Sequence, residues 1–200
     1  MSATLEFFFD FRSPYSYLAN TQLPALGVEV AYRPFEILGL MKEVGNVPTS
    51  VTCKPKSNYL GADLRRWVGI YDVPFQRNPD LATIDARRLL RAVLAVDALG
   101  QAPAAVSAIF RAVWGVPAPL ATAADVAGGL QDRGDVGVSA PDLVSRIDDP
   151  ALDEALDKAT ADAAARGIFG APAMFVGEEM FFGNDRFNFV REALARQEVA

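Results

Sequence analysis

Residues 5–19 read LEFFFDFRSPYSYLA, and this stretch decides the fold. The aromatic run Leu5–Phe9 has the composition of a buried strand. The pair Ser13-Pro14 that follows it is typical of a helix start, with serine as the cap and proline in the first turn. A strand therefore delivers the Ser13 hydroxyl to the positive end of a helix, and such a position favours an anion.

In thioredoxin-like proteins this strand-to-helix junction holds a C-x-x-C redox pair. Here the four residues are Ser13, Pro14, Tyr15 and Ser16. The junction is compatible with that scaffold but not with disulfide exchange, because serine cannot form a disulfide. Taken alone, Ser13-Pro14 is more often an ordinary helix cap than a functional site.

Two segments near the C-terminus add to this pattern. Residues 167–176 read GIFGAPAMFV, which has the form of a helix-ending glycine, a turn and an X-Pro bond entering a strand. We expect the Ala171–Pro172 bond to be cis, because cis X-Pro bonds favour such tight turns. Residues 180–186 read MFFGNDR and run from a strand into a last helix, with Asn184 or Asp185 as its cap.

The hydrophobic pattern predicts a β-α-β start, a long helical block and an α-β-β-α end. The predicted strands are 5–9, 28–34, 173–176 and 180–182. The predicted helices are 14–26, 59–71, 85–99, 104–114, 122–132, 140–145, 150–166 and 185–197, and 37–56 is predicted to be loop after one short helical turn. We divide the chain into a thioredoxin-like domain (1–36 and 150–200) and an insertion of loop and helices (37–149) packed over the site.

The composition excludes several classes of function. The 200 residues carry a net charge of −6 and no histidine, which argues against nucleic acid as a partner and excludes histidine-based catalysis. With Cys53 as the one cysteine, neither an internal disulfide nor a transition-metal centre is expected. No apolar run approaches the about 20 residues needed to span a membrane. The N-terminus lacks the basic region of a signal peptide, so we expect a cytoplasmic protein.

The chain resembles the 2-hydroxychromene-2-carboxylate isomerase family in four segments: FFFDFRSPYSYLA, GLMKEVGNVP, KPKSNYLGADLRRW and GIFGAPAMFVGEEMFFGNDRF. The match runs in order from about residue 5 to residue 194. That family belongs with the kappa-class glutathione transferases in the DsbA-like branch of the thioredoxin superfamily. The resemblance implies an α/β fold with a thioredoxin-like β-α-β…α-β-β-α core, a large all-helical insertion, and a homodimer.

The resemblance also implies glutathione as a cofactor and a role in aromatic catabolism, such as naphthalene degradation. The substrate would be 2-hydroxychromene-2-carboxylate or a related aromatic carboxylate. Addition of the glutathione thiolate, ring opening, bond rotation and elimination would give trans-o-hydroxybenzylidenepyruvate. No net redox change occurs, which is consistent with the missing C-x-x-C pair.

The matched segments assign the family's site residues to positions in this sequence. Ser13 would be the catalytic residue, because a hydroxyl at a helix N-terminus favours the thiolate of a thiol whose ordinary pKa is about 8.5. The resemblance implies that glutathione is bound by Ser13, Ala171, Pro172, Gly183, Asn184, Asp185 and Arg186. It implies that the substrate is bound by Asn46, Lys54, Lys56, Asn58 and Tyr59.

Simpler interpretations stay open at several of these positions. Asn184 and Asp185 are also compatible with helix capping, and Lys54 and Lys56 with solvated charges. Four aromatic residues could form walls around the substrate, although each of them is more typical of a hydrophobic core: Phe11, Phe35, Trp67 and Trp114. Family members often carry asparagine where Asp85 stands here, and an acid there could repel a carboxylate substrate.

Two other functions compete with the isomerase. A kappa-like glutathione transferase would conjugate or reduce electrophiles at the same site, and conjugate release would distinguish it. A DsbA-like fold kept as a binding or scaffold protein would show no affinity for glutathione.

Overall fold

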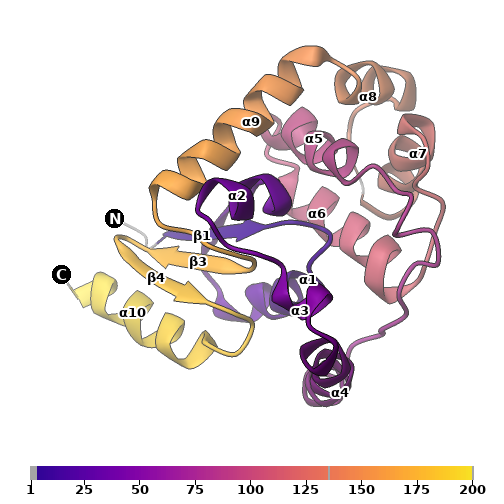
Figure 1. Cartoon of the computed structure of the whole chain (residues 1–200). Helices are drawn as coiled ribbons and strands as arrows, with labels where there is room; N and C mark the ends of the chain where they lie inside the picture. The colour runs from indigo at the N-terminus through magenta and orange to yellow at the C-terminus, as the bar shows by residue number, and fades with distance from the viewer. Residues whose placement is uncertain (1–3, 135, 200) are drawn as a thin grey trace.

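The computed structural model describes residues 4–134 and 136–199. Within them a four-stranded sheet has the order β2-β1-β3-β4, with β1 and β2 parallel and the other pairs antiparallel (Figure 1). The strands are β1 (Thr4–Phe9), β2 (Glu29–Pro34), β3 (Ala173–Val176) and β4 (Glu179–Phe182). Phe7 lies opposite Tyr32 on one side and Met174 on the other, so β1 is a central strand.

Helices cover both faces of the sheet. They are α1 (Pro14–Gln22), α2 (Ile37–Glu43), α3 (Thr49–Thr52), α4 (Lys54–Tyr71), α5 (Ala86–Asp97), α6 (Ala102–Phe110), α7 (Ala123–Gly134), α8 (Ala140–Ile147), α9 (Pro150–Ala165) and α10 (Phe187–Val199). A 3₁₀ turn, η1 (Leu23–Leu26), follows α1, and a π-helical turn, η2 (Arg111–Gly115), follows α6. Figure 1 shows α5, α6, α7 and α8 gathered to one side of the sheet, which confirms the thioredoxin-like core with a helical insertion.

The aromatic run of β1 is explained by burial on both faces of the sheet. Phe7 and Phe9 stack with ring centroids 5.3 Å apart and join a cluster that includes α1, α10 and the helical block. Phe8 points the other way, into a smaller cluster with Phe35 and Phe175 beneath α2 and α9. Each such ring contributes about 2–3 kcal/mol by leaving water. The larger cluster contains residues of both predicted domains. The division of the chain into two domains remains a prediction.

The prediction of a loop over 37–56 is wrong. The Glu36 carboxylate caps α2 by accepting from the backbone N–H groups of Leu38 at 3.3 Å and Gly39 at 2.6 Å. Glycine suits position 39, because an added Cβ would lie 2.7 Å from that carboxylate. A second short helix follows at α3, and α4 begins at Lys54 with proline in its first turn, earlier than the predicted start at residue 59.

Other helix boundaries also differ from prediction, most of them by one or two residues. The first helix ends at Gln22 and continues as a 3₁₀ turn, because Pro24 has no N–H to extend the α-helical ladder. The predicted helix 104–114 is divided between α6 and the π turn. The last helix begins at Phe187, and the Arg186 carbonyl accepts from Val190 N–H at 3.1 Å, so neither predicted cap residue holds that position.

The π turn brings Trp114 to the start of the Ser13 junction. Its indole N–H donates to the Phe11 carbonyl at 2.8 Å, and its ring stacks on Phe75 with centroids 5.8 Å apart. Trp114 is buried, as are Phe11 and Phe35, so these three rings belong to the core and not to an exposed substrate wall.

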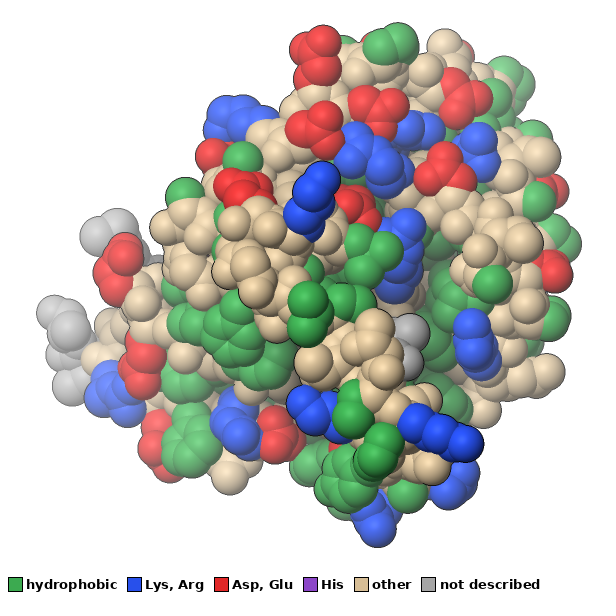
Figure 2. All heavy atoms as spheres, viewed as in Figure 1, with side chains coloured by type: hydrophobic (Ala, Val, Ile, Leu, Met, Phe, Trp, Pro, Cys, Tyr) green, Lys and Arg blue, Asp and Glu red, His purple; other side chains and the backbone are tan. Residues whose placement is uncertain are grey.

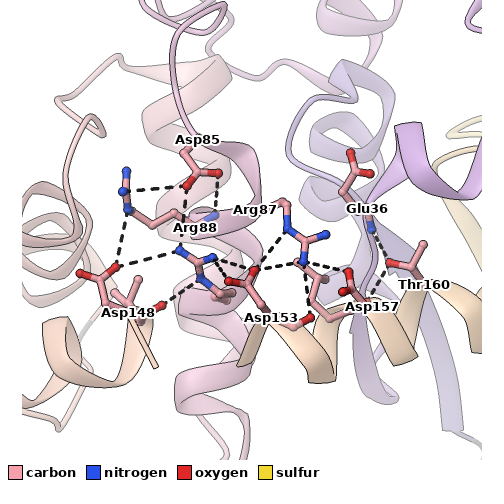
Figure 3. A network of polar contacts seen from close by, with 11 residues as sticks. Glu36, Asp85, Arg87, Arg88, Asp148, Asp153, Asp157 and Thr160 are labelled. Atoms are coloured by element: carbon pink, nitrogen blue, oxygen red, sulfur yellow. Dashed lines mark hydrogen bonds and ion pairs between the residues drawn. The ribbon is translucent and has the colours of Figure 1, made fainter. Parts of the chain in front are cut away.

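A network of ion pairs joins α5 to α9 (Figure 3). Arg91 reaches both oxygens of Asp153 at 2.7 Å, and Arg87 contacts Asp153 and Asp157 at 3.0 and 2.8 Å. Asp85 caps α5 by accepting from Arg88 N–H at 3.2 Å, and its carboxylate lies 3.9 Å from Arg91. The negative charge of Asp85 therefore belongs to this network, where guanidinium groups balance it.

No helix among the described residues is long and apolar enough to cross a bilayer.

Candidate active site

Ser13 lies where the sequence predicts, at the cap of α1. Its hydroxyl oxygen accepts from Ser16 N–H at 3.1 Å, and its O–H donates to the Ala171 carbonyl at 3.1 Å. Two segments 158 positions apart in the chain are joined by this contact. Because a hydroxyl has one proton, Ser13 can offer it either to this carbonyl or to a ligand, but not to both at once.

Ala171 is half-buried and lies two residues before the β3–β4 hairpin. The Ala171–Pro172 bond is cis, as expected. The Pro172 carbonyl accepts from Gly183 N–H at 3.0 Å, so the two halves of the predicted glutathione site are hydrogen-bonded to each other. Gly183 has a φ of 102°, and a Cβ there would lie 2.8 Å from the carboxylate of Asp185. The turn therefore needs glycine at position 183.

Tyr71 of α4 fixes the segment that follows this turn. Its hydroxyl donates to the Asn184 carbonyl at 2.5 Å and accepts from the Asn184 amide at 3.5 Å. Asn184 is buried, whereas Asp185 and Arg186 form an ion pair at the surface. Sequence reasoning missed Tyr71, because it is an ordinary helix residue until α4 packs beside the Asn184 segment.

A second contact between α1 and α4 was also missed. The Tyr15 hydroxyl donates to Asp63 at 2.7 Å, and the Tyr59 hydroxyl reaches the other oxygen of Asp63 at 3.4 Å. Burial and the neighbouring carboxylate of Asp63 raise the pKa of Tyr15, so its hydroxyl stays protonated at neutral pH. Tyr59 is thereby linked to the first turn of α1. Tyr59 itself lies one helical turn after the exposed residues at the start of α4.

The predicted substrate residues occupy two places. Asn46 lies close to the site, because its amide donates to the carbonyl of Phe169, two residues before Ala171, at 2.8 Å. Lys54, Lys56 and Asn58 are exposed on the first turn of α4, where Lys56 donates to Thr49 at 3.0 Å. Within 4–134 and 136–199, no hydrogen bond or ion pair joins these three residues to Ser13, Ala171 or Asn184.

Exposed aromatic rings lie beside the site at positions that sequence reasoning did not select. Phe169 and Phe182 pack with ring centroids 4.5 Å apart, and each is about two-fifths exposed. Figure 2 shows apolar side chains gathered on this face of the molecule over the β3–β4 hairpin. A hollow of about 390 Å³ along β4 and α10 is lined by Phe182, Arg186 and Phe189 and meets the site at Arg186. Another, of about 580 Å³, is lined by Tyr32, Arg33 and Arg166 and does not include Ser13.

The DSBA-like thioredoxin domain family matches residues 4–195 of the chain. With its fold and its Ser13 junction, the protein is thus a member of the DSBA-like thioredoxin-domain class. A 2-hydroxychromene-2-carboxylate isomerase of Sphingobium xenophagum is 36% identical over 199 residues, which cover 97% of this chain and 99% of the relative. A solved structure of a 2-hydroxychromene-2-carboxylate isomerase superposes with a TM-score of 0.86 at 32% identity, covering 97% of this chain and 95% of that one. The chain belongs to the 2-hydroxychromene-2-carboxylate isomerase family.

A more distant relative carries a different name. Glutathione S-transferase kappa 1 of Caenorhabditis elegans is 28% identical over 211 residues, covering 95% of this chain and 90% of the relative.

Proposed function

We propose that the protein catalyses the glutathione-dependent isomerisation of 2-hydroxychromene-2-carboxylate, or of a related aromatic carboxylate, to trans-o-hydroxybenzylidenepyruvate. The observation that carries the proposal is the contact of the Ser13 hydroxyl with the Ala171 carbonyl at the start of α1. It places a hydroxyl, a helix N-terminus and a strand-like backbone edge together in a chain 36% identical to a protein named as this isomerase.

The residues at this site suit glutathione, which is a peptide with a thiol, two carboxylates and an ammonium group. The backbone of Ala171 would pair with its cysteinyl part, as an exposed edge pairs with an extended peptide. Backbone amides at Asn184 and Asp185 would receive the γ-glutamyl carboxylate, and the Asp185 carboxylate would attract the ammonium. The relative named as a kappa-class glutathione transferase supports this assignment.

Glutathione would supply the nucleophilic thiolate, and the task of Ser13 is to hold a negative sulfur at the helix N-terminus. In the ligand-free protein the hydroxyl proton is directed to Ala171. A peptide N–H would bond the second lone pair of the same carbonyl, and the Ser13 hydroxyl would turn from that carbonyl to donate to the sulfur.

The substrate would lie between this junction and the start of α4. Lys54 and Lys56 are exposed cations that would attract its carboxylate, and Asn46, Asn58 and Tyr59 complete the polar set. Its rings would contact the exposed pair Phe169 and Phe182. Asp85 does not oppose this arrangement, because arginines of the network between α5 and α9 balance its charge.

The proposal is tested by calorimetric titration with glutathione, followed by assay of 2-hydroxychromene-2-carboxylate conversion with and without glutathione. Binding of glutathione and glutathione-dependent formation of the trans product are the expected results. Isomerisation that proceeds equally without glutathione would exclude the cofactor, and absence of glutathione binding would favour a scaffold protein.

The second candidate function is a kappa-like transferase, favoured by the similarity to glutathione S-transferase kappa 1. One assay separates the two, because a transferase releases a glutathione conjugate whereas an isomerase returns free glutathione. We expect glutathione to be recovered in full.

We also infer that the protein acts as a cytoplasmic homodimer in aromatic catabolism, such as naphthalene degradation. The exposed ring of Phe189 on α10, beside the edge strand β4, supports self-association, and the lone Cys53 suits a reducing compartment. Light scattering of the purified protein and fractionation of cells test the two parts separately.

A further inference from the structure

Asp10 is a fully buried carboxylate that the proposed reaction does not use. One of its oxygens accepts from Arg12 N–H at 2.7 Å, and the other accepts from Ile37 N–H at 2.9 Å, at the start of α2. Its backbone carbonyl accepts from Ser13 N–H at 3.0 Å. A single residue thus contacts the junction that carries Ser13 and the helix that begins 27 positions away.

The far end of α2 returns to the same site. Asn46 follows this helix, and its N–H donates to the carbonyl of Met41 at 2.8 Å. The Asn46 side chain donates to the Phe169 carbonyl, and two residues later Ala171 accepts from the Ser13 hydroxyl. The contacts form a closed ring from Ser13 through Asp10, α2 and Asn46 to Ala171 and back.

Two charged residues surround the Asp10 carboxylate. The Arg12 guanidinium lies 3.9 Å from it and forms an ion pair with Glu36. The Glu36 N–H donates to Thr160 of α9 at 3.0 Å, which anchors the start of α2 to the covering helix. Among the described residues, Arg12 and Glu36 are the charged groups that interact electrostatically with the Asp10 carboxylate. Arg12 favours its ionised form and Glu36 opposes it.

We propose that Asp10 is a positioning residue, whose ionised carboxylate holds the Ser13 junction against α2 and so couples Ser13 to the Asn46–Ala171 side of the site. Burial raises the pKa of Asp10 to about 6, so the two N–H contacts strengthen as the pH rises through that value. The role deepens the proposed function, since the site that it aligns is the proposed thiol site.

The first test is independent of catalysis and follows backbone amide NMR signals of the ligand-free protein between pH 4.5 and about 8. Arg12 and Ile37 bond the carboxylate directly, whereas Ser13 and Ala171 do not. We expect all four signals to shift along one curve with a midpoint near pH 6. Titration of Arg12 and Ile37 with no movement of Ser13 and Ala171 would overturn the proposal and leave Asp10 as a local cap.

The second test uses the variant Asp10→Asn, which keeps the shape but cannot ionise. We expect the common titration to vanish and the isomerase kcat to fall about tenfold, with the KM for glutathione within about twofold, because alignment and not binding is lost. The matched control is Asp149→Asn, whose carboxylate also accepts a backbone N–H, from Ala151 at 2.9 Å, at the start of α9. An unchanged kcat and pH profile in a folded Asp10→Asn protein would contradict the proposal.

The two proposals fail in different ways. If the isomerase assignment is wrong, the chemical assays show no turnover, but the common amide titration remains. If the role of Asp10 is wrong, turnover is present and the common titration is absent.

Discussion

Ser13 combines two tasks in one hydroxyl, since it caps α1 and contacts Ala171. Loss of a cap costs about 1 kcal/mol of folding free energy, whereas loss of the hydroxyl would also remove the proposed contact to the thiolate. The two tasks are therefore separable by measuring stability and turnover on the same variant.

We predict that Ser13→Ala lowers the free energy of unfolding by about 1 kcal/mol but lowers kcat at least about tenfold, with little change in glutathione affinity. The control is Ser139→Ala, because Ser139 caps α8 by accepting from Asp142 N–H at 3.3 Å. That control should lose similar stability and no activity. Wild-type kcat in Ser13→Ala would exclude thiol activation by this hydroxyl.

Tyr71 holds the backbone of Asn184 from another helix. We predict that Tyr71→Phe weakens glutathione binding about fivefold, since one hydrogen bond that fixes the segment proposed to hold the γ-glutamyl group contributes about 1 kcal/mol. Calorimetry measures the dissociation constant directly. Tyr32→Phe is the control, because it removes the same atom from a largely buried tyrosine of β2 outside the site. Equal effects in the two variants would count against a binding role for Tyr71.

At the scale of elements, the contact between α5 and α9 depends on Arg91, which bonds Asp153 and also donates to the Ile147 carbonyl at 2.9 Å. We predict that Arg91→Met lowers the free energy of unfolding by about 1–2 kcal/mol, because the arginine side chain is only 11% exposed. Lys158→Met on α9 removes a pair with Asp162 in which the lysine is 76% exposed, and should cost less than about 0.5 kcal/mol. Urea denaturation compares the two variants, and equal costs would contradict the argument.

The elements also show what could be predicted from the sequence. Strands β1 and β3 and the start of α1 follow from strong local signals: an aromatic run, a Ser-Pro cap and a Gly-Ala-Pro turn. The helices within 37–56 were missed because their stability depends on contacts distant in sequence. Glu36 caps α2 while Arg12 and Thr160 hold Glu36 in place, and a composition rich in glycine and proline does not reveal such support.

The same limit applies to the candidate site. Its backbone segments were located by motifs, and Ser13, Ala171 and Gly183 do lie together. Asp63 and Tyr71 were not found, because each is an ordinary helix residue until α4 packs beside α1 and the Asn184 segment. An acid directly after the aromatic run Phe7–Phe9 was the one available signal for Asp10.

At the scale of the whole molecule, the buried charge of Asp10 opposes folding at neutral pH. Its pKa rises from 3.8 to about 6, which corresponds to about 3 kcal/mol. Because the pKa is higher in the folded protein, the protonated carboxyl of Asp10 contributes to stability. This contribution is complete below about pH 3 and is lost as the pH rises through 6.

We therefore predict that the free energy of unfolding of the wild type, relative to Asp10→Asn, falls by about 2 kcal/mol between pH 4 and pH 7. Urea denaturation of both proteins across this range measures the difference in stability. The contributions of the other carboxylates are the same in both proteins and cancel in this difference. A difference that does not change with pH would show that Asp10 has an ordinary pKa.

The bond from the Trp114 indole to the Phe11 carbonyl, two residues before Ser13, has an optical consequence. Indole emission responds to the polarity and hydrogen bonding around the ring, and the chain holds two tryptophans. The other, Trp67, packs against Tyr71 with ring centroids 5.3 Å apart and so lies beside the Asn184 segment. Each half of the proposed glutathione site therefore has its own intrinsic fluorophore. Trp67→Phe and Trp114→Phe would let stopped-flow fluorescence follow the arrival of the thiol and of the γ-glutamyl group as separate events in time, without any added label.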